Sequence, residues 1–343
     1  MTGGANAVLA LSRAFYGKRL TETDYEALVN CKSLGEFAGY LKNKEEYASI
    51  LSAAGVSLSA ASLEELIAKQ QFENFATICR YELAVGNRFY QYFIIKTEIE
   101  QILRCTVSLL SGNSEIYLLQ MNPFLDKHVR IDLFALGRAN SLQEVLAVLR
   151  RTPYERIYQS CLSSERVSYL TFELAFQSYF ETAVKSLVKD CFRGAERKAL
   201  AALICNSMDI KLISGLYRAL CSYQDVLPLT QVPLQAMVTM TQFSEREIAQ
   251  FCRCESAQSF LAALEKSCYK DWFSAENEQP LESQLVRSLI ARCKKLIRFS
   301  VYPGVVMFCY LLLSQAQTEN LIRIIEGIKF QLPPQTLRDG LKV

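Results

Sequence analysis

The residues that could do chemistry begin with the single histidine, His128, which lies in the segment NPFLDKHVRID with Asp126 and Asp132 beside it. A histidine held by a carboxylate can act as general base for a serine or cysteine nucleophile. The chain has no G-x-S-x-G nucleophile elbow to accompany it. We therefore interpret His128 as a surface residue between repeated elements and predict no nucleophilic catalysis.

Acidic clusters suggest a second chemistry, because aspartate pairs on facing helices can hold magnesium and diphosphate. The D-D-x-x-D pattern of such sites is absent, and the nearest clusters are Glu64 with Glu65 and Glu98 with Glu100. We interpret both as solvated helix faces or first-turn charges that favour the helix dipole. The phosphate-binding patterns G-x-x-x-x-G-K-[ST] and G-x-G-x-x-G are also absent. We predict no enzymatic activity, no ATP hydrolysis by this chain and no cofactor.

Cysteine spacing and net charge argue against two further classes of site. The twelve cysteines are scattered singly except for Cys252 and Cys254, and no C-x-x-C pair exists. We therefore predict reduced, buried thiols and no metal site. With 38 basic and 35 acidic residues the net charge is +3, and no basic patch stands out, so we predict no nucleic-acid binding.

Membrane targeting is not indicated either. The N-terminal stretch MTGGANAVLALSRAFYGKRL has no cationic start before its apolar residues, so we predict no signal peptide. The most apolar stretch, residues 301–313, is shorter than the about 20 residues that a spanning helix needs. We predict that no segment crosses a membrane.

The elements that position these residues come from a repeated unit. Three windows share one apolar helix face and begin with serine: SLGEFAGYL at 33–41, SLQEVLAVL at 141–149 and SAQSFLAAL at 256–264. A tyrosine follows each window, namely Tyr47, Tyr154 and Tyr269. We predict that these tyrosines anchor the short helices, with the hydroxyl reaching backbone or water. Ser33 with Glu36 and Ser141 with Glu144 are predicted to form capping boxes.

Longer helices repeat in a similar register. The segments EIEQILR (98–104), LISGLYR (212–218) and NLIRIIE (320–326) are 114 and then 108 residues apart. A second block, EELIAKQQFENF at 64–75, matches FELAFQSYFETA at 172–183 with an offset of 108. If residues 63–110 form one long helix, we expect it to bend at Gly86-Asn87. In the last segment Leu321, Ile324, Ile325 and Ile328 form an apolar stripe that needs a core partner.

Strand patterns are weak throughout, so we predict an all-α fold built from three similar helical lobes in a pseudo-threefold arrangement. The predicted lobes are residues 1–115, 116–224 and 225–343.

The repeated pattern SLGEFAGYLKNKEEY, SLQEVLAVLRRTPY, SAQSFLAALEKSCY and the C-terminal segment YLLLSQAQTENLIRIIEGIKFQLPPQTL resemble the C subunit of bacterial and archaeal V/A-type rotary ATPases. That family is similar to the d subunit of eukaryotic V-ATPases, and the resemblance spans nearly the whole chain. Its last helix typically reads Asn-Leu-Arg, then apolar residues and a glycine seven after the asparagine. The matching positions here are Asn320, Leu321, Ile324, Ile325 and Gly327.

Some positions depart from the family pattern. Ile322 stands where an arginine is usual, and Arg323 follows one place later. The first two copies carry Glu98 and Leu212 at the position of the asparagine. These changes bear on residue-level contacts, whereas the apolar positions of the pattern are intact.

The resemblance implies a funnel-shaped, non-catalytic central-stalk subunit at the cytoplasmic face of a membrane. It implies two partners, the central shaft and the membrane rotor ring, and a role in coupling proton or other ion transport to ATP synthesis or hydrolysis. Two alternatives stay open: a stand-alone helical scaffold or adaptor, and a helical lyase or transferase. Candidate partner contacts are the basic side chains Arg104, Arg218, Arg150 and Arg151, for which helix-dipole contacts or plain solvation are the competing interpretations.

Overall fold

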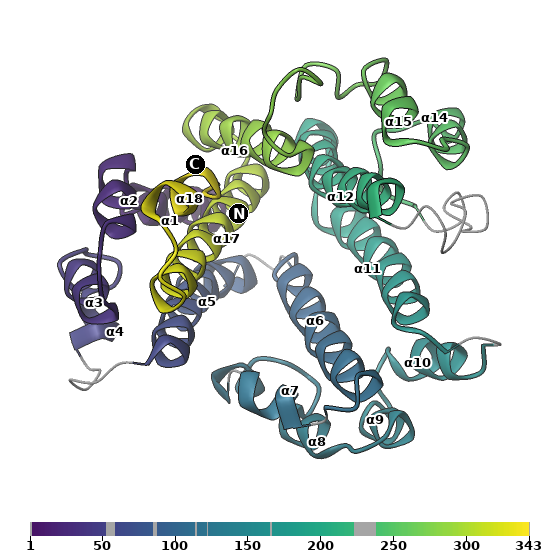
Figure 1. The fold of residues 1–343 in the computed structure, drawn as a ribbon, viewed down its shortest axis with the longest axis horizontal. Coiled ribbons are helices and arrows are strands. Elements are labelled where there is room, and N and C mark those ends of the chain that lie inside the picture. Colours follow the sequence, from purple (N-terminus) through teal and green to yellow (C-terminus); the bar gives the residue numbers. More distant parts are fainter. Residues whose placement is uncertain are drawn as a thin grey trace. The chain divides into compact units, whose positions relative to one another are not determined.

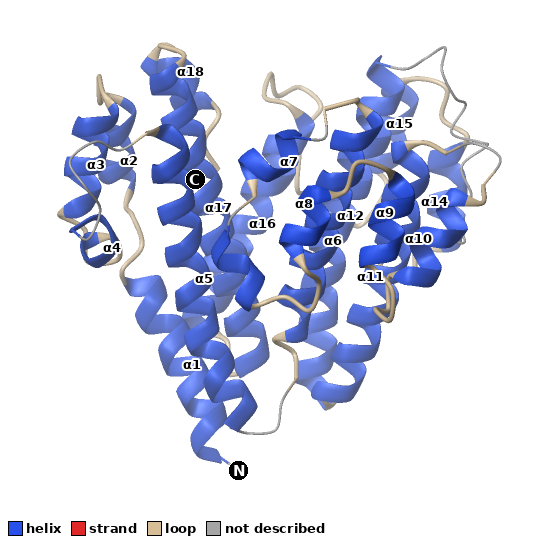
Figure 2. Ribbon diagram, turned by 90° about the horizontal axis from the view of Figure 1, so that it is seen from below, coloured by secondary structure: helices blue, strands red, loops and turns tan. Residues whose placement is uncertain are grey.

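The structure is a computed structural model that describes residues 2–52, 59–84, 88–113, 115–121, 123–164, 167–222 and 238–342. Helices and connecting loops make up all of these residues, and no strand occurs among them (Figures 1 and 2). The predicted all-α fold is confirmed.

Contacts between residues divide the chain into two compact units. Unit 1 comprises residues 1–87, 192–231 and 241–343, and unit 2 comprises residues 88–191 and 232–240. The three predicted lobes, with their boundaries at 115 and 224, are drawn from the sequence repeat, and these two units do not test them. The lobes therefore remain a prediction.

Unit 1 is built around the long helix α17, Pro303–Lys329, which packs against α1 (Thr2–Gly17), α5 (Ala60–Ala84) and α16 (Leu281–Phe299). The helix α12, Gly194–Ser222, packs against α16 and α17. Proline at the first position of α17 supplies a fixed φ where no backbone donor is needed. Seventeen of the helix's residues are buried, which explains its apolar composition on more than one face.

Short helices complete unit 1: α2 Glu22–Val29, α3 Leu34–Lys42, α4 Ala48–Ser52, α14 Glu245–Cys252, α15 Ala257–Leu264 and α18 Pro334–Asp339. Helices α2 to α4 share one hydrophobic cluster with α17, in which Phe37 and Leu41 meet the predicted stripe. Leu321, Ile324 and Ile325 are fully buried there, and Ile328 is half-buried against the same cluster. The stripe therefore covers a core, as its spacing predicts.

The helix α18 packs closely on α17 because Gly327 carries no side chain. A Cβ built at Gly327 would lie 2.2 Å from Cδ2 and 3.0 Å from Cγ of Leu337. Leu337 is buried in the cluster that α17 shares with α2 to α4. Glycine at this position thus lets the last helix cover the first short helices.

Unit 2 has two long helices that pack side by side, α6 (Gln91–Leu110) and α11 (Tyr169–Cys191). Its short helices are α7 Glu115–Gln120, η1 Pro123–Lys127, α8 Leu133–Arg138, α9 Leu142–Val148 and α10 Glu155–Leu162. Tyr158 of α10 packs on Phe172 of α11, with ring centroids 4.7 Å apart. Such aromatic contacts attach the short helices to the long ones.

Two local predictions need correction or qualification. Ser33 and Ser141 do cap α3 and α9, but Glu36 and Glu144 accept hydrogen bonds from the residue before the cap and not from the cap itself. The reciprocal half of each predicted capping box is therefore wrong. Helix α5 ends at Ala84 and α6 begins at Gln91, and the predicted bend at Gly86-Asn87 lies outside the described residues.

One helix of the described residues, α12 over Gly194–Arg218, has the length and hydropathy of a membrane span. Sixty-one per cent of its most apolar stretch is buried inside the structure. Its apolar side chains therefore have protein partners in α16 and α17. Of the stretch 301–313, singled out in the sequence, residues 303–313 form the first turns of α17, and residues 304–311 are buried, whereas Val301 is exposed.

Candidate functional site

The repeated windows form three short-helix modules, each packed on one long helix. Module 1 is residues 20–52 on α17, module 2 is residues 130–162 on α6, and module 3 is residues 241–272 on α12. Each module contains one of the predicted tyrosines, and all three tyrosines are buried. One polar side chain on each long helix binds both the tyrosine hydroxyl and the backbone at the start of the module. We call these side chains, Glu98, Asp209 and Gln317, the anchor residues.

The anchor of module 2 is Glu98 on α6, which is fully buried. Tyr154 donates its hydroxyl to Oε2 of Glu98 at 2.5 Å, and Arg130 donates its backbone N–H to Oε1. The Arg130 guanidinium adds an ion pair to Oε2 at 2.8 Å. Both carboxylate oxygens thus have charged or polar partners, as a buried charge requires.

Burial and the neighbouring Glu98 carboxylate raise the pKa of Tyr154 well above its usual range. The hydrogen bond to Glu98 raises the pKa of the Arg130 guanidinium. The tyrosine therefore stays protonated and the arginine stays charged. The interpretation of Glu98 as part of a solvated helix face is wrong, whereas Glu100 is exposed and pairs with Lys96 as expected of such a face.

The anchor of module 3 is Asp209 on α12, which is 1% exposed. Its Oδ2 accepts from the Tyr269 hydroxyl at 2.7 Å and from the backbone N–H of Gln242 at 2.8 Å. Its Oδ1 accepts from the hydroxyl of Thr241. Burial and the Asp209 carboxylate raise the pKa of Tyr269 well above its usual range. The pattern of contacts is the one seen at Glu98, with a different acid.

The anchor of module 1 is Gln317 on α17, and it is an amide. Its Oε1 accepts from the backbone N–H of Leu20 at 2.9 Å, and its Nε2 donates to the Tyr47 hydroxyl at 2.9 Å. The same Nε2 donates to Oε2 of Glu46 at 2.8 Å, and Asn74 of α5 donates to Oε1 of Glu46. Burial raises the pKa of Glu46 to about 7. The anchoring of module 1 therefore includes a carboxyl group whose pKa lies near neutral pH.

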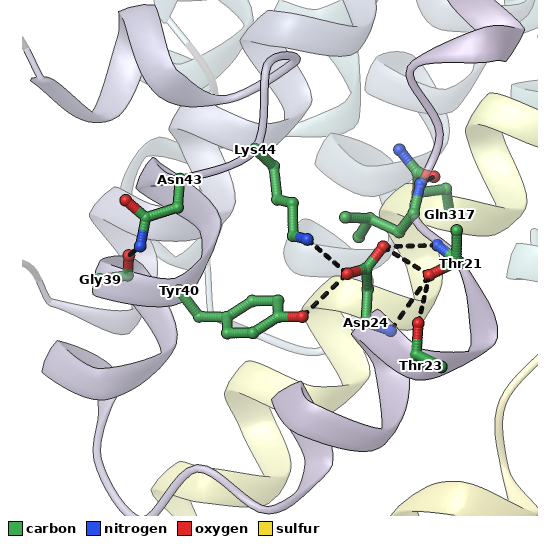
Figure 3. A network of polar contacts seen from close by, with 9 residues as sticks. Thr21, Thr23, Asp24, Gly39, Tyr40, Asn43, Lys44 and Gln317 are labelled. Carbon is green, nitrogen blue, oxygen red and sulfur yellow. Dashed lines mark hydrogen bonds and ion pairs between the residues drawn. The ribbon is translucent and has the colours of Figure 1, made fainter.

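Inside module 1, Asp24 joins the short helices to one another (Figure 3). It accepts from the backbone N–H of Thr21 at the start of α2 and from the Tyr40 hydroxyl of α3. Lys44, in the turn after α3, forms an ion pair with it. Burial acts to raise the pKa of Asp24, but the hydrogen bonds from Lys44, Thr21 and Tyr40 outweigh burial and hold that pKa well below its usual range.

The contacts refine the register of the repeat. Asp209 and Gln317 are 108 residues apart, which matches the sequence alignment of the long helices. Glu98 and Asp209 are 111 residues apart and not 114, a difference of about one helical turn. In this register Gln101, and not Glu98, corresponds to Asn320. Apolar positions recur nearly every turn, so an alignment based on them can be wrong by one turn. The anchors occur once in each long helix, so an alignment based on their contacts has a single register.

The predicted partner contacts are exposed. Arg104 lies on the solvent side of α6, and Arg150 and Arg151 lie in the turn between α9 and α10. Arg151 has a φ of 64° and donates its backbone N–H to Glu155. Arg218 on α12 donates to the carbonyl of Ser214 on the preceding turn of its own helix. Arg104, Arg150 and Arg151 belong to unit 2 and Arg218 belongs to unit 1.

The residues considered for chemistry have structural contacts. His128 is exposed, Asp126 accepts from the backbone N–H of Leu133, and Asp132 caps α8. Within the described ranges no group of three or more His, Cys, Asp or Glu side chains could hold a metal ion. All twelve cysteines lie in those ranges without forming a disulfide, and five are buried.

The amino-acid sequence assigns this all-helical protein to a known class, the ATP synthase C/AC39 subunits. The family model described as "ATP synthase (C/AC39) subunit" matches residues 8–340. The chain belongs to this family, and the resemblance drawn from its sequence is confirmed.

Two archaeal relatives agree with the family. The C subunit of the A-type ATP synthase of Thermococcus kodakarensis is 20% identical over 350 residues, covering 95% of this chain and 87% of the relative. The corresponding protein of Methanosphaera stadtmanae is 23% identical over 261 residues, covering 75% of this chain and 64% of the relative. Low identity over such lengths fits an apolar framework with few fixed positions.

We expect Glu98→Ala to destabilise unit 2 by on the order of 3 kcal/mol, because it leaves the Tyr154 hydroxyl and the Arg130 backbone N–H without their acceptor. The matched control is Glu100→Ala on the same helix, which removes the pair that the exposed Glu100 makes with the half-buried Lys96 at 3.8 Å and should cost less than about 0.5 kcal/mol. Urea unfolding followed by circular dichroism measures both. Equal losses in the two variants would contradict the role of Glu98.

The raised pKa of Glu46 predicts a pH-dependent stability of the full chain. The folded protein binds the proton of the Glu46 carboxyl more tightly than the unfolded chain does, because this carboxyl has a pKa near 4.5 in the unfolded chain. Protonated Glu46 therefore contributes on the order of 3 kcal/mol to the free energy of unfolding. This contribution is fully present below pH about 4.5 and is lost as the pH rises through about 7.

The variant Glu46→Gln should remove this loss, so it should be more stable than the wild type at a pH above about 7. Glu45→Gln changes the exposed neighbour that pairs with Lys18 and is the control. Thermal unfolding across this pH range gives the measurement. A Glu46→Gln variant with the same pH profile as the wild type would rule the assignment out.

Proposed function

We propose that this chain is a non-catalytic central-stalk subunit that couples the rotor shaft to the membrane rotor ring of an A/V-type ATP synthase. The observation that carries the proposal is the family match over residues 8–340. The two archaeal relatives, each the C subunit of an A-type ATP synthase, support it. The partners are then the central shaft and the rotor ring, and the location is the cytoplasmic face of the membrane without insertion.

The internal packing suits such a part. A coupling element must not yield when torque is applied, so its helices need contacts that resist sliding. Close-packed apolar side chains resist compression, and directional hydrogen bonds resist translation of one helix along another. In each module the anchor fixes the short helices on the long one by at least two hydrogen bonds. Torque would pass through these contacts without any reaction in this chain.

Three similar modules also suit a partner that repeats. Quasi-equivalent lobes, with the boundaries 1–115, 116–224 and 225–343, would present similar helix ends to a ring of identical subunits. Several weak contacts of this kind bind more strongly together than singly. The rotor would thus gain a firm attachment without one dominant contact.

The direct test is reconstitution of the rotary complex with and without this chain. The complex that lacks it should still hydrolyse ATP in its catalytic head but should not drive proton or other ion uptake into vesicles, and adding the chain should restore uptake. Ion uptake at an unchanged rate without the chain would overturn the proposal. Failure to co-purify with head and ring would instead favour a stand-alone scaffold.

The exposed arginines predict where assembly is weakened. Alanine at Arg104, Arg150, Arg151 or Arg218 should leave the circular dichroism and the unfolding temperature nearly unchanged, since each side chain is exposed. Removing a charge from an interface should weaken capture of shaft or ring several-fold in a pull-down. Arg156→Ala, exposed on α10, is the matched control. If all five variants behave alike, these four residues are not partner contacts.

A further inference from the structure

A pocket of about 380 Å³ opens in unit 1 beside module 1. Its walls come from the end of α1, the start of α2, and the facing sides of α16 and α17. The apolar part of the lining includes Phe15, Ile290 and Leu313. The size falls in the range of small-molecule sites, which are concave, mostly apolar and have a few placed polar groups.

The charged side chains that line this pocket are mainly basic. Arg19, Lys294, Arg298 and Lys342 all line it. Lys294 and Arg298 lie one turn apart on α16, so both face the same side, and neither forms an ion pair with any residue in the described ranges. Lys342 is paired with Glu319, and Arg19 lies over the ring of Tyr16. Two cations can therefore bind a ligand without giving up an ion pair within the described chain.

A buried hydroxyl adds a neutral polar group to these cations. Tyr16 lines the pocket, is 8% exposed, and its hydroxyl has no hydrogen-bond partner among the residues that the structure describes. A buried hydroxyl without a partner costs free energy, so a group that accepts its proton is stabilised there. The hydroxyl can donate one hydrogen bond while Lys294 and Arg298 supply positive charge.

Acidic side chains do not cancel this charge. Glu22 lines the pocket but is exposed, and Glu46 lies at its buried side. Burial raises the pKa of Glu46 to about 7, so this carboxyl is largely neutral in mildly acidic solution. Its oxygens already accept from Asn74 and Gln317. The pocket is thus positively charged where it opens on α16.

We propose that this pocket binds a small phosphate-bearing anion, held by Lys294 and Arg298 and by the Tyr16 hydroxyl. A phosphate group offers several acceptor oxygens and a charge of up to two, which matches two cations and one donor. The apolar walls would receive the rest of a phosphorylated molecule. The same chemistry is offered by a phosphorylated metabolite in solution and by a phospholipid headgroup.

Because α1, α2, α16 and α17 all line the pocket, a bound anion would stabilise module 1 against α17. Ligand binding to the folded state raises its stability by mass action. The proposal does not depend on the coupling function, since it concerns the isolated full-length chain.

The experiment is calorimetric titration of the full-length chain with inorganic pyrophosphate, together with co-sedimentation with phosphatidylcholine vesicles that contain phosphatidic acid. The variants are Lys294→Gln with Arg298→Gln, and Tyr16→Phe, which removes only the hydroxyl. The control is Lys295→Gln, an exposed lysine on the same helix that does not line the pocket. Circular dichroism checks that each variant is folded.

We expect the double variant to lower the affinity at least about tenfold, Tyr16→Phe about three- to tenfold, and Lys295→Gln less than about twofold. This dependence in the pyrophosphate titration supports a soluble ligand, and the same dependence in vesicle binding alone supports a headgroup. No binding by the wild type to either probe overturns the proposal. Equal losses in Lys295→Gln and the double variant also overturn it, because they show only general attraction to a basic helix.

Discussion

The rest of the structure depends on how a buried polar side chain is satisfied. Glu98, Asp209 and Gln317 lie on long helices, and each is buried. A carboxylate or amide in such a place is destabilising unless its acceptors and donors are filled. The short helices fill them with a tyrosine hydroxyl and a backbone N–H. The hydrogen bonds of each anchor are satisfied only when the short helices are packed in their correct position on the long helix. This requirement selects a single register for each module.

The anchors also show how three copies of one unit can diverge. All three anchors present an acceptor to a backbone N–H, although their residue types and partners differ. Glu98 has an arginine partner, Asp209 a threonine and Gln317 a glutamate. The shared requirement is geometric, so the residue type can change as long as its partners change with it. A buried charge needs a cation or several donors, whereas a buried amide needs a donor for its oxygen and acceptors for its N–H groups. This freedom explains why the repeat is easier to see in the short windows than in the long helices.

Much of the fold follows from sequence because it rests on spacing. The apolar stripe of Leu321, Ile324 and Ile325, the serine caps of α3 and α9, and the burial of Tyr47, Tyr154 and Tyr269 are local patterns. The anchors could not be predicted, because their partners are 56, 60 and 270 residues away along the chain. A lone glutamate in a helix, such as Glu98, has the same local pattern whether it faces water or a tyrosine. The basic pocket is hidden for the same reason, since Arg19 and Lys294 come from opposite ends of the sequence.

The pairing of Gln317 with the first module has a consequence for synthesis. Tyr47 leaves the ribosome early, but its partner Gln317 follows 270 residues later. Until α17 emerges, Phe37 and Leu41 lack the helix against which they are buried. The nascent chain therefore carries an unprotected apolar surface while the residues between this module and α17 are synthesised. Any product that stops short of α17 keeps that apolar surface exposed, and exposed apolar surface of this kind is what chaperones bind.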